Sequence, residues 1–386
     1  MADVRTERTV TSRTGGGGLG VGPLLIVILA SLCAFGAIFA LWINRQLLST
    51  DDWTRTSTQL IENTVIRDEL ATYLVDQLPA RADLGSRIRE ALPVPLPVPD
   101  EATGGLSDVA KRGVAQVLAQ PAAQAAWTDA NRSAHAEFVR VMEGGGTVVS
   151  TQGGLVVLDV GDLIGQVTDR VGIGRGLAGS IPEGAGEITI LRSGQLETAQ
   201  DVVRGLKGLP VILVVLSLGL IGATLAFVAD RRREVLQAYG IGLLVAGIGA
   251  LLVRWLARGP VLDGLAPPDA VRPAAEAAWG ISTTLLREVA IATIVYGAVL
   301  VAGTWLAGPS ERAVAIRGKL ARYAHEAVVV YAVLAVIAVL LIVVGPTGAT
   351  RGPGTALVLI ALLAAGTEAL RRQIVREHPR ARPREG

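Results

Sequence analysis

The sequence is poor in the residues that build disulfides, metal sites and aromatic binding surfaces. Its 386 residues include one cysteine, three histidines and only 4% aromatic residues. A lone cysteine, Cys33, forms neither an intrachain disulfide nor a cysteine-based metal site. The histidines, His135, His325 and His378, are too far apart along the chain to suggest a metal-binding motif. We therefore expect no metal and no cofactor.

A strong excess of charge is missing too. The net charge is +2, and Lys and Arg form short clusters beside apolar runs instead of spreading over a surface that would fit a nucleic-acid groove. Nucleic acid is therefore not an expected partner. What the chain has in excess is apolar length, with 51% hydrophobic residues and a mean hydropathy of +0.48. These values predict an integral membrane protein.

Six apolar runs are long enough, or nearly long enough, to supply the roughly 20 residues that a membrane-spanning helix needs. We therefore predict a membrane all-α bundle of six transmembrane helices, with an extracytoplasmic α+β domain inserted between the first two. Spans 2 to 6 form a five-helix transmembrane region, 209–370. The predicted spans are residues 23–44, 209–229, 235–256, 286–307, 324–345 and 355–370.

The central parts of these spans contain no Asp, Glu, Lys, Arg or His. Ion-coupled transporters usually place ionisable groups at that depth, so this class is disfavoured, although an uncharged pore is compatible with the pattern. Intramembrane proteolysis is disfavoured as well, because Ser31 and Ser217 have no histidine or paired aspartates at similar depth. We predict that the protein is not an enzyme.

Basic residues in short segments set the orientation, because they resist translocation across the membrane. The predicted inner segments contain sixteen Lys and Arg residues and the short outer loops only three. This asymmetry places both termini in the cytoplasm, with a disordered tail at 1–22 and a basic tail at 371–386 that is attracted to anionic lipid headgroups. The predicted membrane-surface anchors are Arg231, Arg232, Arg233, Arg371 and Arg372.

The first span has two alternative interpretations. Small residues such as Ala34 and Gly36 offer cleavage sites for a signal peptide, but the apolar stretch is long for one, so an uncleaved anchor is favoured. Cys33 invites a lipoprotein interpretation, but the residue before a lipidated cysteine is normally small and here it is Leu32.

Residues 45–208 form the only large segment without a span, and they contain 15 Lys and Arg against 21 Asp and Glu. We predict an extracytoplasmic α+β domain. It opens with one long helix after the capping stretch Ser49–Asp51, with Ile61, Val65, Leu70, Leu74 and Leu78 on one buried face. Further helices are expected at 84–92, 105–119, 122–142, 162–171 and 194–207, and strands at 147–150, 155–160 and 187–191, with a Pro-rich spacer at 92–99.

A polar stripe is the strongest candidate site. Trp127, Asn131 and His135 recur every four residues and share one face of a helix. Asn and His on one face are able to bind a polar ligand or transfer a proton. The favoured interpretation is structural: the two polar groups bond to a neighbouring segment while Trp127 and Phe138 fill the core, since no nucleophile or metal ligand is near in sequence.

Small residues gather in the third span, including Gly242 and Ala246 at the spacing typical of closely packed membrane helices. Close helix contact is the simplest explanation. The spacing leaves open whether the contact lies within one chain or between copies in a homo-oligomer.

Several short segments, spread over most of the chain, together carry a resemblance to a known family. They are Leu74–Leu78, Trp127 with Ala130–Arg132 and Ala134–His135, Ala199–Gln200, Arg231–Arg233, Trp279–Leu286, and Ala307–Pro309 with Arg317. As a set they resemble a family of uncharacterised actinobacterial polytopic integral membrane proteins. The resemblance implies a multi-pass protein of the bacterial plasma membrane, and it implies no reaction.

Two functions are consistent with these features. The first is a non-enzymatic membrane protein whose outer domain senses, scaffolds or binds an envelope protein or lipid. The second is a transporter or channel for an apolar or zwitterionic solute. A polar-lined cavity through the spans would favour the second, and a closed apolar bundle beneath a grooved outer domain would favour the first.

The predicted orientation can be tested by cysteine labelling of intact cells in a Cys33→Ser background. Ser107→Cys and Gly352→Cys should react with a membrane-impermeant reagent added outside, whereas Gly318→Cys should not, because it lies within a basic inner segment. Reaction of Gly318→Cys from outside would overturn the orientation.

Overall fold

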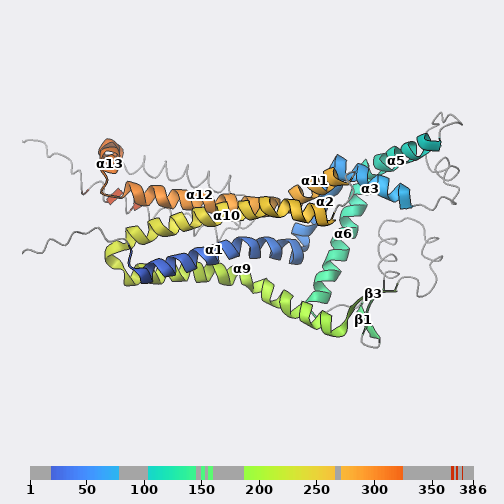
Figure 1. The fold of residues 1–386 in the computed structure, drawn as a ribbon, viewed down its shortest axis with the longest axis horizontal. Helices are drawn as coiled ribbons and strands as arrows, with labels where there is room; N and C mark the ends of the chain where they lie inside the picture. Colours follow the sequence, from blue (N-terminus) through green and yellow to red (C-terminus); the bar gives the residue numbers. More distant parts are fainter. Residues whose placement is uncertain are drawn as a thin grey trace, which may run out of the picture.

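The computed structural model describes residues 19–77, 103–144, 149–152, 155–159, 187–265, 271–324, 367–368, 371–372 and 376. Figure 1 shows long helices running side by side, with shorter helices at one end and α13 at the other. The helices are α1 (Val21–Leu48), α2 (Thr50–Glu62), α3 (Thr64–Gln77), α5 (Thr103–Ala119), α6 (Pro121–Met142), α9 (Ser193–Phe227), α10 (Arg232–Leu265), α11 (Arg272–Ser282), α12 (Thr284–Leu306) and α13 (Glu311–Ala324), with a 3-10 turn η1 (Ala229–Arg231) before α10.

Four of the described helical segments are long and apolar enough to cross a membrane. They are Val21–Leu48, Thr198–Phe227, Ala229–Gly264 and Thr284–Leu306, which contain the first four predicted spans. Much of their apolar surface is exposed, as Val211, Val215 and Leu256 show, and an exposed surface of this kind is stable in lipid. The protein is therefore a multi-pass integral membrane protein. The predicted spans at 324–345 and 355–370 fall almost wholly outside the described residues.

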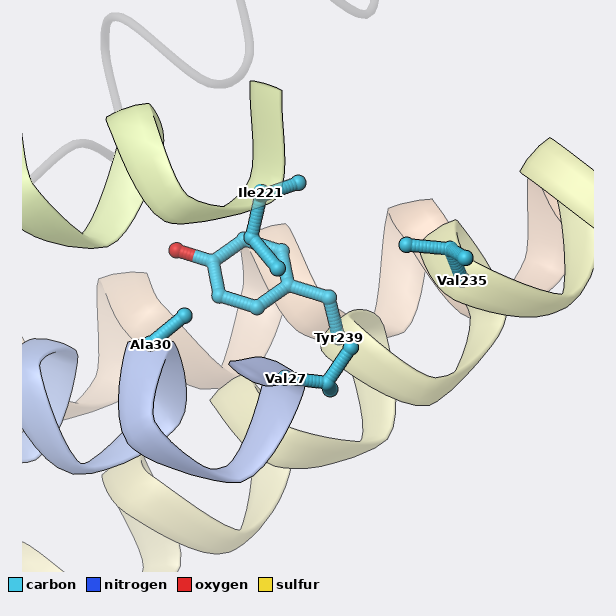
Figure 2. Close-up of a cluster of buried hydrophobic side chains, with 5 residues drawn as sticks. All are labelled: Val27, Ala30, Ile221, Val235 and Tyr239. Atoms are coloured by element: carbon cyan, nitrogen blue, oxygen red, sulfur yellow. The ribbon is translucent and has the colours of Figure 1, made fainter. Parts of the chain in front are cut away.

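One core cluster of the bundle joins α1, α9 and α10 around Tyr239 (Figure 2). The Tyr239 ring lies among Val27, Ala30 and Ile221, and its hydroxyl is 2.8 Å from Ser217 Oγ. Ser217 Oγ in turn donates to the backbone oxygen of Ala30 over 2.7 Å. A hydrogen bond to a helix backbone satisfies the buried serine. The pair therefore joins three helices through hydroxyl groups, without a charged side chain.

Helices α10 and α12 touch through glycines. A Cβ placed on Gly297 would lie 2.7 Å from the backbone oxygen of Gly240, and a Cβ on Gly247 would lie 2.6 Å from the backbone oxygen of Ala290. Gly242 of α10 lies against Ser31 of α1. The close contacts expected for the third span therefore lie within one chain, where small residues let two backbones approach.

The predicted single helix after residue 51 is wrong, because it breaks at Asn63 into α2 and α3. Asn63 has an extended ψ of 123°, and its side-chain oxygen accepts from the backbone N–H of Ile66 over 3.2 Å. Asparagine is a strong N-cap, so it ends α2 and starts α3. The break also means that the predicted apolar residues do not share one buried face: Ile61 is buried, whereas Val65 and Leu74 are exposed.

The segment before α9 contains three strands, β1 (Val149–Gln152), β2 (Leu155–Asp159) and β3 (Glu187–Arg192), which pair antiparallel in the order β1-β2-β3. They overlap the Val-rich segments expected to be strands, with an irregular register between Val156 and Val157. Helix α9 follows β3 directly and continues into the membrane, so the expected helix 194–207 and the second span are one element. The segments 84–92 and 162–171 lie outside the described residues, and an α+β domain over the whole of 45–208 stays a prediction.

Two helices were not expected from the sequence. Helix α11 follows two prolines and precedes α12, and it packs against α2 and α3. Helix α13 follows α12 in a segment expected from the sequence to be a basic loop, because its charged residues interrupt the helical spacing of its apolar residues. Both have fewer than 18 residues, so a search for membrane spans overlooks them.

The glycine contact generates a prediction about stability. Gly297→Ala should lower the thermal unfolding temperature of the full chain in detergent micelles, because its Cβ meets backbone that must move, at a cost of about 1 to 3 kcal/mol. Gly303→Ala on the same helix is the matched control, since a Cβ there meets nothing within 4 Å. It should gain slightly in stability from its higher helix propensity. Equal effects of the two substitutions would contradict the packing described.

Candidate functional site

The junction where α1 meets α2, α6 and α11 is rich in polar contacts among the described residues. Helix α1 ends at Leu48, and Ser49 caps α2 by accepting from the backbone N–H of Asp52 over 3.3 Å. Asp51 and Asp52 lie in the first turn of α2, where the helix dipole favours negative charge. The cap therefore fixes the angle at which the chain leaves the first span.

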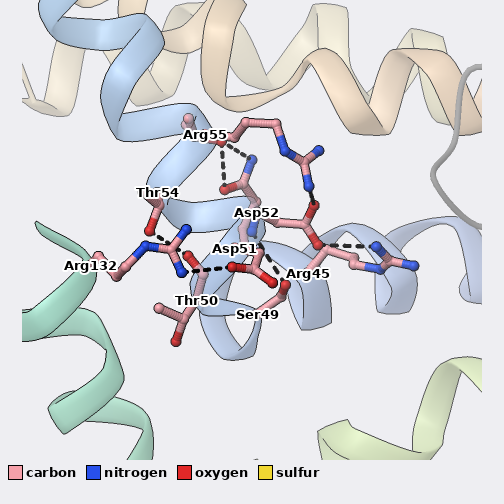
Figure 3. Close-up of polar contacts among 10 residues, drawn as sticks. Arg45, Ser49, Thr50, Asp51, Asp52, Thr54, Arg55 and Arg132 are labelled. Atoms are coloured by element: carbon pink, nitrogen blue, oxygen red, sulfur yellow. Dashed lines mark hydrogen bonds and ion pairs between the residues drawn. The ribbon is translucent and has the colours of Figure 1, made fainter. Parts of the chain in front are cut away.

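Asp52 links α1 to α2 (Figure 3). It is 9% exposed, and its carboxylate accepts from Arg45 over 3.1 Å and from Arg55 over 2.8 Å. Burial alone would raise the pKa of this carboxyl. Hydrogen bonds from Ser49 and Arg45, with the positive charges of both arginines, outweigh burial and hold the pKa of Asp52 below its usual value. The group is therefore an ionised, fully paired anchor.

His135 brings α6 to the same junction. It is 7% exposed, its Nδ1 lies 3.2 Å from Thr50 Oγ1, and its ring stacks on Trp53 with centroids 5.2 Å apart. Burial lowers the pKa of His135, while hydrogen bonding to the backbone of Gln46 and Leu47 acts in the opposite direction. The imidazole is therefore neutral at pH 7. A second bridge is an ion pair of 2.8 Å from Arg132 to Asp51.

The other two residues of the polar stripe make different contacts. Trp127 Nε1 donates to Ser57 Oγ over 2.8 Å, which joins α6 to α2. Asn131 Nδ2 donates to the backbone oxygen of Trp127 over 3.0 Å, so it contacts its own helix. The structure thus brings Trp127 and His135, but not Asn131, to α2. The expectation that Phe138 fills the core is wrong: it is 43% exposed, and its ring is tilted against that of His135 with centroids 5.9 Å apart.

A second polar junction lies where α11 meets α12. The backbone oxygen of Ser282, at the C-terminus of α11, accepts from Trp42 Nε1 and from Gln46 Nε2, each over 2.9 Å. Arg254 of α10 donates through Nε to Thr283 Oγ1 over 2.8 Å. Carbonyls at a helix C-terminus have no partner within the helix, so side chains from α1 supply one.

The opposite end of the bundle holds the predicted anchor Arg233, together with Arg317, which was not predicted as an anchor. Arg317 is 3% exposed and donates to the backbone oxygen of Gly308 over 2.7 Å, while Arg233 reaches the backbone oxygen of Thr304 at 3.5 Å. Arg317 also donates to the backbone oxygen of Leu306, so both arginines lie at the C-terminal end of α12, where the helix dipole favours cations. Of the other anchors, Arg231 pairs with Glu234, Arg232 donates to the backbone oxygen of Leu225, and Arg371 and Arg372 pair with Glu368.

The polar groups at the junction of α1, α2, α6 and α11 bond to one another and hold these helices together. Within the described residues no group of three His, Cys, Asp or Glu side chains could hold a metal ion. Sequence reasoning found the capping stretch and the stripe, but it missed Arg45, Asp52 and the Ser282 carbonyl. The only local signal was the three-residue spacing of Asp52 and Arg55. Comparison with protein-family models, with curated proteins and with solved structures found no match.

The buried imidazole generates a prediction with a definite pH window. The pKa of His135 is lowered in the folded protein, so the unfolded chain binds a proton at higher pH, near the ordinary value of 6.5. The free energy of unfolding should therefore fall as pH drops below about 6.5, and His135→Ala should remove this part of the dependence. The substitution should also cost about 1 to 3 kcal/mol at pH 7.5, because Thr50 loses its partner.

Asn131→Ala is the matched control for His135→Ala. It removes a hydrogen bond within α6 only, so the full chain should keep its response to pH between 7.5 and 5 in thermal unfolding. Asp52 loses its stabilising effect only as pH falls through a pKa below 3.8, which separates the two groups. A His135→Ala protein that keeps the wild-type slope below pH 6.5 would contradict the buried neutral imidazole.

Proposed function

We propose that the chain is a non-enzymatic, multi-pass protein of a bacterial plasma membrane whose outer region binds an envelope protein or lipid and holds it in fixed relation to the spans. The proposal includes six spans, cytoplasmic termini, an outer α+β domain over residues 45–208, and membership of the uncharacterised actinobacterial family that the sequence resembles. These parts rest on the hydropathy pattern, the basic asymmetry and the resemblance segments.

The observation that carries the proposal is the double attachment of the outer helices. Asp52 joins α2 to Arg45 of α1, and Ser282 joins α11 to α1. His135 joins α6 to Thr50 at the start of α2. A freely hinged binding module would need neither bond. Because both attachments use buried or half-buried polar groups, breaking one leaves unsatisfied partners, which favours a fixed arrangement.

Exposed apolar side chains on the outer helices support a binding role. Tyr73 is 59% exposed, Leu74 is 41% exposed, and Val117 of the neighbouring α5 is 45% exposed. These residues belong to α3 and α5, which pack against each other at the end of the molecule away from α13 (Figure 1). Large apolar side chains exposed on helices outside the spans are compatible with an interaction site.

The alternative is a transporter or channel for an apolar or zwitterionic solute. The backbone contact between Gly240 and Gly297 leaves no space for a solute between α10 and α12, which favours the binding role over transport. No contact among the described residues favours the alternative specifically.

Photo-crosslinking in native membranes tests the binding role. A photoreactive amino acid at Tyr73 should give a discrete adduct with one envelope component. The same group at Val215, on the exposed apolar face of α9, should give only bulk phospholipid adducts. Identical adducts at the two positions would contradict an outer binding surface, and solute uptake by vesicles containing the purified protein would support the alternative.

A further inference from the structure

Helix α13 lies across the end of the spans instead of continuing them. It follows α12 after the short connection 307–310, and Figure 1 shows it nearly end-on while the spans run across the view. Ser310 caps its first turn through a 3.3 Å hydrogen bond to the backbone N–H of Ala313. The buried Arg317 holds the helix against the C-terminus of α12. An axis perpendicular to the spans lies parallel to the membrane surface.

The faces of α13 differ in chemistry. Ala313 and Arg317 form the side that packs against the bundle, with 0% and 3% exposure. Val314 and Ile316 flank that side and are 41% and 40% exposed, so they lie beside the bundle where lipid would surround it. Ala315 is exposed between them, on the face directed away from the bundle.

Cations accompany the exposed apolar residues. Arg312 and Lys319 are exposed and lie on the same flank as Ile316, because residues three and four apart are neighbours on a helix. Glu311 is the only acidic residue within α13. A helix with apolar residues beside a bundle end and exposed cations at its edge has the pattern of an interfacial amphipathic helix.

We propose that α13 is an interfacial helix that binds anionic phospholipid headgroups of the inner leaflet. Arg312 and Lys319 contact the phosphates, and Val314 and Ile316 enter the boundary between headgroups and acyl chains. Anionic headgroups are the complementary partner because the net charge of the helix is positive and its exposed apolar side chains need a nonaqueous surface. The choice of leaflet rests on the proposed function, which places this end of the bundle in the cytoplasm.

The test uses the full chain reconstituted in bilayers, in a Cys33→Ser background, with a fluorophore on Ile316→Cys or on the control Ala315→Cys. The quencher is a lipid brominated near the headgroup, supplied as phosphatidylglycerol or as phosphatidylcholine at equal mole fraction. The Ile316 probe should be quenched and the Ala315 probe should not. Phosphatidylglycerol should quench several-fold better than phosphatidylcholine, because anionic lipid gathers at the helix.

The charge requirement is tested by Arg312→Gln with Lys319→Gln. The preference for anionic lipid should fall roughly fivefold for each charge removed, and should fall also as salt rises. The control pair Lys111→Gln with Arg112→Gln on α5 should keep the preference. Equal quenching at 316 and 315 would overturn the interfacial placement, and equal quenching by both lipids would overturn anionic recognition. An inverted orientation, shown by outside labelling of Gly318→Cys, would refute the leaflet and the proposed topology while leaving the quenching result intact.

Discussion

The architecture depends on how the helix ends at the membrane surfaces satisfy their backbone carbonyls. The last carbonyls of a helix have no partner within that helix, and lipid offers none. Here side chains from other helices supply the bonds: Trp42 and Gln46 donate to Ser282 at one end, and Arg317 donates to Leu306 at the other. The bonds to Ser282 join α1 to α11 across 240 and 236 residues of the chain, whereas Arg317 joins α13 to the preceding helix α12. Satisfying the helix ends therefore also fixes how these helices meet.

The charged groups follow the same division between ends and centre. Arg45 and Asp52 pair at one end of the bundle, and Arg233 and Arg317 lie at the other end. In the interior, Ser217 and Tyr239 contribute hydroxyl groups. Ionised groups are costly at membrane depth, whereas hydroxyls bonded to a helix backbone are not. Close packing between α10 and α12 then relies on glycine, which needs no polar bond to bring two backbones together.

Four spans could be predicted from the sequence because apolar length is a property of each segment alone. The break at Asn63 could not, since the apolar period runs through it and only the cap geometry reveals the end of α2. Helices α11 and α13 escaped because their length and charge resemble those of loops.

The candidate site was predictable in part. The four-residue spacing of Trp127 and His135 places both on one face, but their partners, Ser57 and Thr50, lie 70 and 85 residues away in the chain. Local spacing contains no information about such partners. The same holds for Arg317: the sequence showed only that it belongs to a basic segment, whereas its buried bonds to the end of α12 depend on the turn between α12 and α13.

The central claim is that helices α2, α6 and α11 and the spans form a single rigid unit. The most direct test is the distance between spin labels at the exposed positions Ala134 of α6 and Leu256 of α10, measured by pulsed electron resonance on the full chain in bilayers, in a Cys33→Ser background. The account predicts one narrow distance distribution that broadens when Asp52→Asn and His135→Ala are combined. A broad distribution in the otherwise unaltered protein, unchanged by those substitutions, would contradict it.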